Sequence, residues 1–445
     1  MEKGNRTTDK RILPHMRYPE NFKMHYYAAI LNRLPIAIWR LPNSREQCAV
    51  VNFDGAYSRI NLDLNDAAAG FVLTPFFSQE ENTSVFIEGH LYLQNSTAET
   101  FLANNENGHS RLLANKSRYE QTVDELSQAF QSKNNGLDRI LTSKWFAAAE
   151  TKNIPSVSND DYCQWVEKAV ASIRRTELEK VVISRCVEYN LRQHFDPFVL
   201  YHKLCCEYPN AFISLVAIPE MGTWIGATPE LLISVSDEEL MTVALAGTRS
   251  VEKTNDKDWG KKELVEQAIV SDYIRECFRQ QGIADFKEAG PTTVQIGNLL
   301  HLKTQFGYHL AQNRRQIDIN RFLTDLHPTP AVCGVPKMMA YRFIQEMETH
   351  DRELYAGFLG PVNLHGHTQL FVNLRCLQLL PTSAILYAGS GITEDSIPEK
   401  EGVETELKLK ALLNILNSKH QFQGSVEEYS ESISVTDRVL CDDQF

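Results

Sequence analysis

The pattern of hydrophobic and polar positions changes along the chain. From about residue 25 to 102, short runs are wholly apolar or alternate between apolar and polar positions, as in 48–53 and 84–89. Such runs predict β-strands. Residues 104–157 are more polar and contain a helical pattern around 119–132 between asparagine- and glycine-containing stretches. We interpret this part as a connecting segment.

From about residue 160 onward, strands and helices alternate densely. The predicted helices are 160–173, 197–208, 261–280, 337–348 and 403–416, and the predicted strands are 180–185, 211–216, 223–225, 231–235, 240–245, 355–362, 370–379 and 384–388. Several of these strands follow one another too closely for a parallel crossover, so they are expected to pair in antiparallel fashion. The pattern predicts an α+β fold with helices over a largely antiparallel sheet.

Composition narrows the class of protein. The 445 residues are 43% hydrophobic and 23% charged, as in ordinary globular proteins, and the net charge of -12 argues against nucleic acid or an anionic membrane as a partner. The nine cysteines contain no CxxC pair, and no apolar run approaches the roughly 20 residues of a membrane-spanning helix. We therefore expect a cytoplasmic protein. Because its net charge is negative, an anionic substrate would need a local cluster of cations.

Two single charges stand beside predicted strands. Lys180 begins the run KVVISR, where a lysine either reaches solvent or sits in a cavity that lowers its pKa toward that of a useful base. Glu230 lies in the bend of GATPELL between two apolar strands, either as a half-buried acid with a raised pKa or as a solvated turn residue. Neither segment decides between its two interpretations.

Two pairs of glutamates fall one helical turn apart on predicted helices. Glu263 and Glu266 form one pair, and Glu401 and Glu404 form the other. If both helices present their carboxylates to one cavity, the oxygen-rich site suits Mg²⁺. Surface helices also carry such pairs routinely, and this alternative stays open for each pair taken singly.

Other candidate residues are glycines, cations and histidines. The glycines of YAGSGI (387–392) and LAGTR (245–249) follow strands and would let backbone N–H groups approach an anion. Arg375 within the strand 371–375 suits a carboxylate, and Lys408 follows Glu404 by one turn. His301 and His327 lack partners at metal-ligand spacing, and a lone histidine among apolar residues is more often a core group. The chain has neither a GxSxG elbow nor a Walker A loop.

In chain order, these segments resemble the chorismate-utilising enzymes: isochorismate synthase, salicylate synthase, anthranilate synthase component I and aminodeoxychorismate synthase component I. The matching segments are KVVISR, GATPELL, LAGTR, ELVEQAIV, HLKTQF, LHPTPAVCG, RELYAGFLG, NLRCLQL, YAGSGI and EKEGVETELK. The resemblance implies an α+β, four-layer α/β/β/α sandwich with its active site in a cleft between the halves. The expected parts are a flexible tail (1–17), one enzyme fold (18–424) and an acidic tail (425–445), and within the fold a variable part (18–103), the connecting segment (104–157) and a catalytic region (158–424).

The resemblance also implies roles for individual residues. Lys180 matches the general base that activates water, and Glu230 matches the general acid. Mg²⁺ would be bound by Glu266 and Glu404, supported by Glu263 and Glu401. The implied substrate-binding residues are Gly247, Thr248, His301, Ala331, Tyr355, Arg375, Gly389, Gly391 and Lys408.

Three positions distinguish the activities within this family. The ammonia-using branch usually has glutamine at the position of Lys180, aminodeoxychorismate synthases often have a lysine at Ala246, and salicylate synthases typically have threonine at Ala331. All three favour isochorismate synthase, which the resemblance implies to be magnesium-dependent and, by default for this branch, monomeric. The sequence has no glutaminase-like segment with a nucleophilic cysteine elbow, so we expect no obligatory glutaminase subunit. We expect the enzyme to serve menaquinone rather than siderophore biosynthesis. The alternatives are a salicylate synthase and a non-catalytic chorismate-binding relative.

Three residues depart from the family pattern. Gln267 stands where a histidine commonly follows the first metal glutamate, Ser390 stands where alanine is usual between the two glycines, and Gly402 replaces a bulkier residue. The first departure affects the surroundings of the metal ligands rather than the ligands themselves. No departure removes a reacting group.

Overall fold

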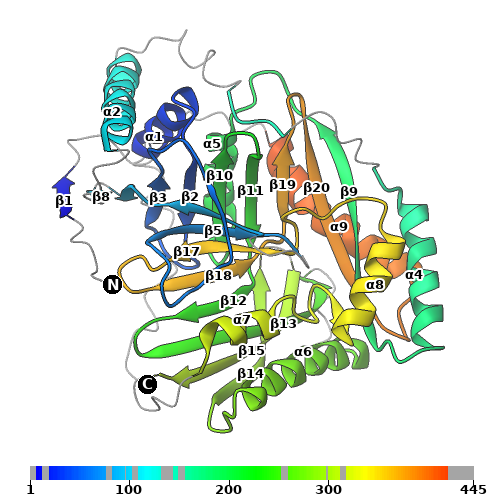
Figure 1. Cartoon of the computed structure of the whole chain (residues 1–445). Coiled ribbons are helices and arrows are strands. Elements are labelled where there is room, and N and C mark those ends of the chain that lie inside the picture. The colour runs from blue at the N-terminus through cyan, green and yellow to red at the C-terminus, as the bar shows by residue number, and fades with distance from the viewer. Residues whose placement is uncertain are drawn as a thin grey trace, which may run out of the picture.

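Two antiparallel β-sheets packed against each other form the centre of the protein (Figure 1). The computed structural model describes residues 7–12, 20–76, 83–95, 97–102, 109–131, 144–148, 156–251, 259–296, 299–310 and 317–418. In this part, sheet A contains eleven strands in the order β1-β8-β7-β3-β2-β10-β11-β19-β20-β9-β16, and sheet B contains nine in the order β14-β15-β13-β12-β18-β17-β5-β6-β4.

The strands of the two sheets run in different directions, so the sheets cross (Figure 1). The strands of sheet A are β1 (Thr7–Ile12), β2 (Ile36–Arg40), β3 (Gln47–Val51), β7 (Leu91–Gln94), β8 (Thr97–Leu102), β9 (Lys180–Asn190), β10 (Phe212–Ile218), β11 (Gly222–Thr228), β16 (Gly334–Val335), β19 (Cys376–Leu379) and β20 (Ser383–Ile392). The strands of sheet B are β4 (Ser58–Ile60), β5 (Gly70–Thr74), β6 (Ser84–Glu88), β12 (Leu231–Val235), β13 (Glu239–Ser250), β14 (Lys287–Ile296), β15 (Leu299–His309), β17 (Phe358–Val362) and β18 (Thr368–Val372).

Helices cover the outer faces of both sheets. They are α1 (Glu20–Leu31), α2 (His109–Gln131), α4 (Asn159–Ile173), α5 (Pro197–Glu207), α6 (Lys261–Gln280), α7 (Ile319–Leu326), α8 (Lys337–Met347) and α9 (Pro398–Asn417). Helices α1, α5 and α9 pack on sheet A, and α6 packs on β13 and β15 of sheet B. The predicted α+β sandwich of helix, sheet, sheet and helix layers is therefore confirmed. Among the described residues, none of these helices is long and apolar enough to cross a membrane.

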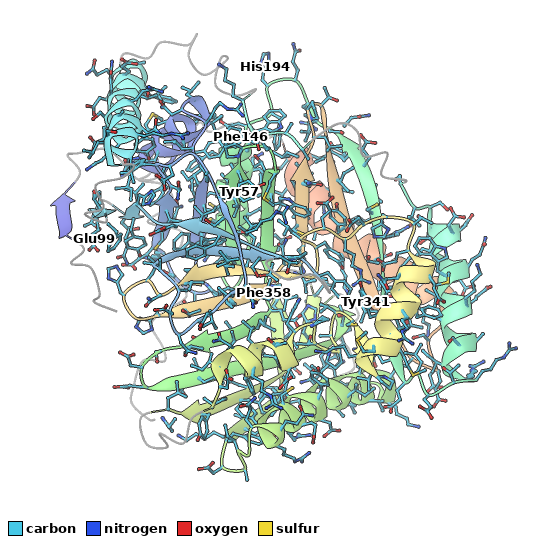
Figure 2. All side chains as sticks on the ribbon, viewed as in Figure 1. Tyr57, Glu99, Phe146, His194, Tyr341 and Phe358 are labelled. Atoms are coloured by element: carbon cyan, nitrogen blue, oxygen red, sulfur yellow. The ribbon has the colours of Figure 1, made fainter. Side chains whose placement is uncertain are left out.

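The alternation of side chains along buried strands explains how the layers form. In β10, Phe212 and Val216 belong to the core between the sheets, whereas Ile213 and Leu215 belong to the core beneath the helices of sheet A. Phe212 stacks on Phe371 of β18 with ring centres 4.1 Å apart, which joins the two sheets directly. Side chains fill the space between the layers in this way (Figure 2).

Two of the places where the chain passes from one sheet to the other lie next to each other. It leaves sheet A after β11 and enters sheet B at β12, and it returns from β18 to β19. The two crossings are joined by backbone hydrogen bonds from Val372 N–H to Glu230 O (3.0 Å) and from Ala227 N–H to Arg375 O (3.1 Å). Glu230 and Arg375, which lie far apart in sequence, therefore meet between the sheets.

Some local expectations differ from the structure. Arg375 is not inside a strand but in the break between β18 and β19, with a φ of 46°, because the chain changes sheets there. Tyr355 precedes β17 instead of belonging to it, and the glycines of YAGSGI lie within β20 instead of following it. Residues 7–12, expected within a flexible tail, pair as β1 with β8. The acidic tail 425–445 lies outside the described residues, and α2 forms part of the connecting segment.

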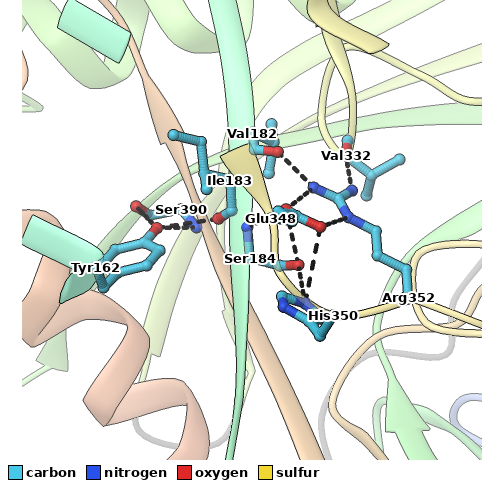
Figure 3. Close-up of polar contacts among 9 residues, drawn as sticks. All are labelled: Tyr162, Val182, Ile183, Ser184, Val332, Glu348, His350, Arg352 and Ser390. Carbon is cyan, nitrogen blue, oxygen red and sulfur yellow. Dashed lines mark hydrogen bonds and ion pairs between the residues drawn. The ribbon is translucent and has the colours of Figure 1, made fainter. Parts of the chain in front are cut away.

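A buried ion pair fastens the end of α8 to strand β9 (Figure 3). Arg352 donates to both oxygens of Glu348, to Val182 O (2.7 Å) and to Val332 O (2.9 Å). Glu348 Oε1 also accepts the backbone N–H of Ser184 (2.6 Å). Because these side chains are only 4% and 3% exposed, each charge depends on the other for its stabilisation.

We therefore expect Glu348→Ala to lower the free energy of unfolding by about 3–5 kcal/mol, since it leaves the Arg352 charge buried and unpaired. Glu346→Ala, at an exposed position of the same helix, should change it by less than about 0.5 kcal/mol. Urea unfolding followed by circular dichroism measures both variants. Equal stability of the two would contradict the importance of this ion pair.

Candidate active site

A cavity of about 90 Å³ lies where the two sheet crossings meet, between β20, β13, α6 and α9. Most of the residues predicted from the sequence line it, although they come from widely separated segments. These residues are Glu230, Gly247, Thr248, Glu266, His301, Ala331, Tyr355, Arg375, Gly389, Gly391, Glu404 and Lys408. Ala246, which was used to choose among activities, also lines the cavity.

Lys180 is fully buried beside this cavity. Its side chain is 0% exposed, and its Nζ lies 3.1 Å from Glu266 Oε1 on α6. Gly391 of the neighbouring strand β20 leaves space for the Lys180 and Glu266 side chains. A Cβ at this position would overlap Glu266 Oε1 and come within 3.0 Å of Lys180 Cε. The interpretation of Lys180 as a solvated strand-end lysine is therefore wrong.

Glu230 is a buried acid instead of a solvated turn residue. It is 4% exposed at the crossing from β11 to β12. Burial raises its pKa to about 8, although the nearby charges of Lys180 and Lys408 act in the opposite direction. At neutral pH the group is mainly protonated, so it is suited to donate a proton.

The candidate metal ligands lie at the facing ends of α6 and α9, and each of three carboxylates contacts a lysine. Glu266 contacts Lys180, Glu404 Oε1 lies 2.8 Å from Lys408 Nζ, and Glu401 accepts a hydrogen bond from Lys262. Although burial raises the pKa of Glu266, Lys180 and Lys262 hold it below its ordinary value. The lysines thus balance a concentration of negative charge.

The positions of these carboxylates bear on whether the site suits Mg²⁺. In the described part of the chain, no three His, Cys, Asp or Glu side chains converge as metal ligands. Glu263 and Glu401 do not line the cavity, and Glu263 packs against Gly247. The donors are nevertheless all carboxylates, and the buried Glu401 Oε2 has no hydrogen-bond partner among the described residues. The chemistry of this set of donors fits Mg²⁺. To bind the ion, the carboxylate side chains must rotate and break their contacts with the lysines.

His301 positions Arg375 in the cavity. Its Nδ1–H donates to Gly247 O (3.2 Å), so Nε2 is free to accept a hydrogen bond from Arg375 Nη2 (3.0 Å). Burial and the charges of Arg375 and Lys408 hold the pKa of His301 well below its ordinary value, which agrees with this neutral form. Gly247, with a φ of +72°, sits at a β-bulge where register shifts between Ala246 and Thr248.

Two cations with different surroundings bring positive charge to the cavity. Arg375 is 8% exposed, and Lys408 Nζ donates to Gly389 O (2.8 Å). Tyr355 stacks on Tyr387 with ring centres 5.3 Å apart, and both rings line the cavity. The arrangement suits a flat molecule carrying negative charge.

Sequence reasoning did not identify Lys262 or Tyr387 as parts of this region. Lys262 lies four residues before Glu266 on α6, a spacing that places the two on one face of the helix.

His327 lies outside the cavity near Phe76 O (3.0 Å), where burial lowers its pKa to about 3, so it is the expected core histidine. Gln267 ties α6 to sheet B by donating to Ala244 O and Thr304 Oγ1.

Comparison with known proteins adds to this geometry. The family described as chorismate binding enzyme matches residues 64–417. The isochorismate synthase EntC of Escherichia coli K12 is 29% identical over 303 residues, which cover 66% of this chain and 76% of that protein. The isochorismate synthase MenF of Bacillus subtilis strain 168 is 31% identical over 286 residues, which cover 62% and 58% of the two chains.

Solved structures share the fold. The menaquinone-specific isochorismate synthase MenF from Escherichia coli superposes with a TM-score of 0.71 at 20% identity, covering 93% of this chain and 95% of that one. Anthranilate synthase component I from Streptococcus pneumoniae TIGR4 has a TM-score of 0.57 at 18% identity, covering 91% and 92%. Enzymes with different names therefore share this architecture, and activity must be argued from the site.

The raised pKa of Glu230 predicts a pH-dependent stability. The folded protein keeps this proton up to a pKa of about 8, whereas the unfolded chain releases it near 4.5, so stability falls as pH rises through this window. Glu230→Gln removes the titration. Between pH 5 and 9, we expect the wild type to lose about 4 kcal/mol of unfolding free energy relative to this variant. A constant difference in urea unfolding across this range would contradict the burial argument.

Proposed function

This chain belongs to the chorismate binding enzyme family, and we propose that it is an isochorismate synthase, an isomerase that converts chorismate to isochorismate. The observation that carries the proposal is that one cavity has a fully buried lysine, Lys180, beside it and a protonated carboxylic acid, Glu230, in its wall. A lysine and a carboxylic acid suit the addition of water and the loss of a hydroxyl. Curated relatives named isochorismate synthase support the same activity.

The cations of the cavity explain how a protein with a net charge of -12 binds chorismate, which is a dianion. Arg375, held by His301, would bind the enolpyruvyl carboxylate together with Tyr355. Lys408, held by Gly389 O, would face the ring carboxylate. Local positive charge in a buried site outweighs the distant surface charge, which solvent and salt screen.

The reaction then follows from two proton transfers. Once Lys180 has released the proton that it holds in its ion pair with Glu266, its amine accepts a proton from water while the water oxygen bonds to the ring. The ring double bond shifts, and the original C–O bond breaks. Glu230 donates its proton to the departing hydroxyl, which leaves as water. Return of the proton from Lys180 to Glu230 through solvent restores the starting state, so atoms and charges balance.

We propose that Glu266 and Glu404 hold Mg²⁺, with Glu263 and Glu401 in support. When bound, the metal would polarise the ring carboxylate and offset the negative charge of substrate and ligands. For this to occur, Glu401 must exchange its contact with Lys262 for the metal or its waters. Lys262 is therefore an internal competitor for the same carboxylate.

Two alanines support the isochorismate product. Ala246 and Ala331 both line the cavity, and neither supplies a nucleophilic amine or a hydroxyl. A lysine at the first position is frequent in the aminodeoxychorismate branch, and a threonine at the second is typical of the salicylate branch. The remaining alternatives are a salicylate synthase, which also eliminates pyruvate, and a non-catalytic chorismate-binding relative.

We further propose that the enzyme is a cytoplasmic monomer without an obligatory glutaminase subunit and that it serves menaquinone biosynthesis. Sedimentation of the purified chain tests the oligomeric state. The identity of neighbouring genes tests the pathway, because menaquinone and catechol siderophore pathways use the same isomerisation.

Product analysis tests the activity. The protein with chorismate and Mg²⁺ should yield isochorismate by liquid chromatography, and Lys180→Ala should reduce the rate by at least about a hundredfold while chorismate binding stays measurable by calorimetry. Lys168→Ala, at an exposed position of α4, serves as the matched control and should keep full activity. Salicylate with pyruvate, anthranilate in the presence of ammonia, or no turnover would overturn the proposal.

Competition by Lys262 predicts a measurable change in metal affinity. Lys262→Met removes the cation that contacts Glu401, so Mg²⁺ should bind about three- to tenfold more tightly in calorimetry without substrate. Lys261→Met, at the exposed neighbouring position, should leave the affinity unchanged. If the wild type binds no Mg²⁺, the metal proposal fails. Equal affinity of wild type and Lys262→Met would refute the competition alone.

A further inference from the structure

A second and much larger cavity, of about 710 Å³, opens between α8, the β10–β11 turn and the strands β5 and β6. It shares no lining residue with the candidate active site. Its volume is in the range of small-molecule sites, roughly 300–1,000 Å³. The function proposed above assigns it no task.

The walls of this cavity combine flat apolar surfaces with an excess of acid. The aromatic lining residues are Tyr57 and Tyr341, which Figure 2 labels, and Phe76 and Trp224. The charged lining residues are Arg59, Glu220, Glu348, Asp351, Arg352 and Glu353. Glu348 and Arg352 neutralise each other and Glu353 has a further interaction, so Glu220 and Asp351 are the carboxylates set against Arg59. Such walls favour a cation over an anion.

Two buried acceptors in the same walls have no partner among the described residues. Gln378 Oε1 is one, in a side chain only 3% exposed, and His350 Nδ1 is the other. The hydrogen of Ser184 Oγ goes to Glu348, so Ser184 Oγ accepts from His350 Nε2–H (3.0 Å), which leaves Nδ1 as a bare acceptor. Burial lowers the pKa of His350, in agreement with this neutral form. Unpaired buried acceptors favour a ligand that donates hydrogen bonds.

We propose that this cavity is a second ligand site and that it takes a small organic ammonium ion with a flat apolar body, such as an aromatic amine. The aromatic lining residues, Tyr57 and Tyr341 among them, suit the flat body, and Glu220 and Asp351 at exposed positions attract the ammonium group as it enters. After a small adjustment of the walls, the ammonium hydrogens would satisfy Gln378 and His350.

The walls of this site are also walls of the catalytic region. Trp224 stacks on Tyr387 (5.7 Å between ring centres), and Tyr387 stacks on Tyr355 (5.3 Å), so three rings lead from one cavity to the other. Arg352 lines the larger cavity and donates to Val182 O, a residue that lines the smaller one (Figure 3). An occupant that shifts Trp224 or Arg352 would therefore change the affinity for a ligand in the active site.

Calorimetry with tryptamine as the probe tests the site. Tryptamine should bind saturably with one molecule per chain, whereas indole-3-propionate, which carries the same ring and the opposite charge, should not. The double variant Glu220→Gln/Asp351→Asn should weaken tryptamine binding at least about tenfold. The matched double variant Asp237→Asn/Glu238→Gln, on the exposed β12–β13 turn, should bind as the wild type does.

A second tryptamine titration, in saturating chorismate, tests where tryptamine binds and whether the two cavities are coupled. It uses the Lys180→Ala variant so that chorismate is not turned over. Tryptamine should still bind, with an affinity changed at least about threefold. Competitive displacement would place the probe in the active site, and unchanged affinity would refute the coupling. The absence of saturable tryptamine binding, equal binding of the anion, or equal binding to the Glu220→Gln/Asp351→Asn variant would overturn the proposed site. These outcomes do not depend on which product the enzyme makes.

Discussion

Two backbone hydrogen bonds join the adjacent places where the chain passes between the sheets, and the candidate site depends on them. Val372 N–H donates to Glu230 O, and Ala227 N–H donates to Arg375 O. These bonds satisfy backbone groups that the sheets no longer pair, and they fix the carboxyl and the guanidinium in one gap. Helices α6 and α9 then bring the carboxylates Glu266 and Glu404 to the same cavity. The candidate groups thus come from helices and from short connections between strands.

Charge balance is the second constraint on the site. Burying Lys180 or Glu266 alone would be unfavourable by several kcal/mol, so each contacts the other, and Lys262 and Lys408 balance further carboxylates. Glu266, Glu401 and Glu404 each contact a lysine in this way. Glu230 has no such contact and retains its proton instead. Away from the cavity, Glu348 and Arg352 fasten β9 by the same principle and at the same time form a wall of the larger cavity.

The sequence predicted most elements of the fold because their signals are local. The helix over 261–280 and the strand from Lys180 have their expected positions, since apolar periodicity depends on nearby residues alone. The strand predicted over 370–379 is instead divided into β18 and β19 around Arg375, because the two halves pair with different sheets. Pairing of distant strands leaves little trace in a local pattern, so a change of sheet within one apolar run was not visible.

By itself, the sequence determined the residue types of the candidate site, the α+β class and, through its ordered motifs, the resemblance to chorismate-utilising enzymes. The tertiary structure decided the protonation of Glu230, the burial of Lys180 and the lysine partner of each paired carboxylate. It also decided that a second cavity lies behind Tyr387 and Trp224. The physical reason is that desolvation and Coulomb interactions depend on distances between atoms that are remote in sequence, whereas hydrophobic periodicity and turn chemistry depend on neighbours along the chain.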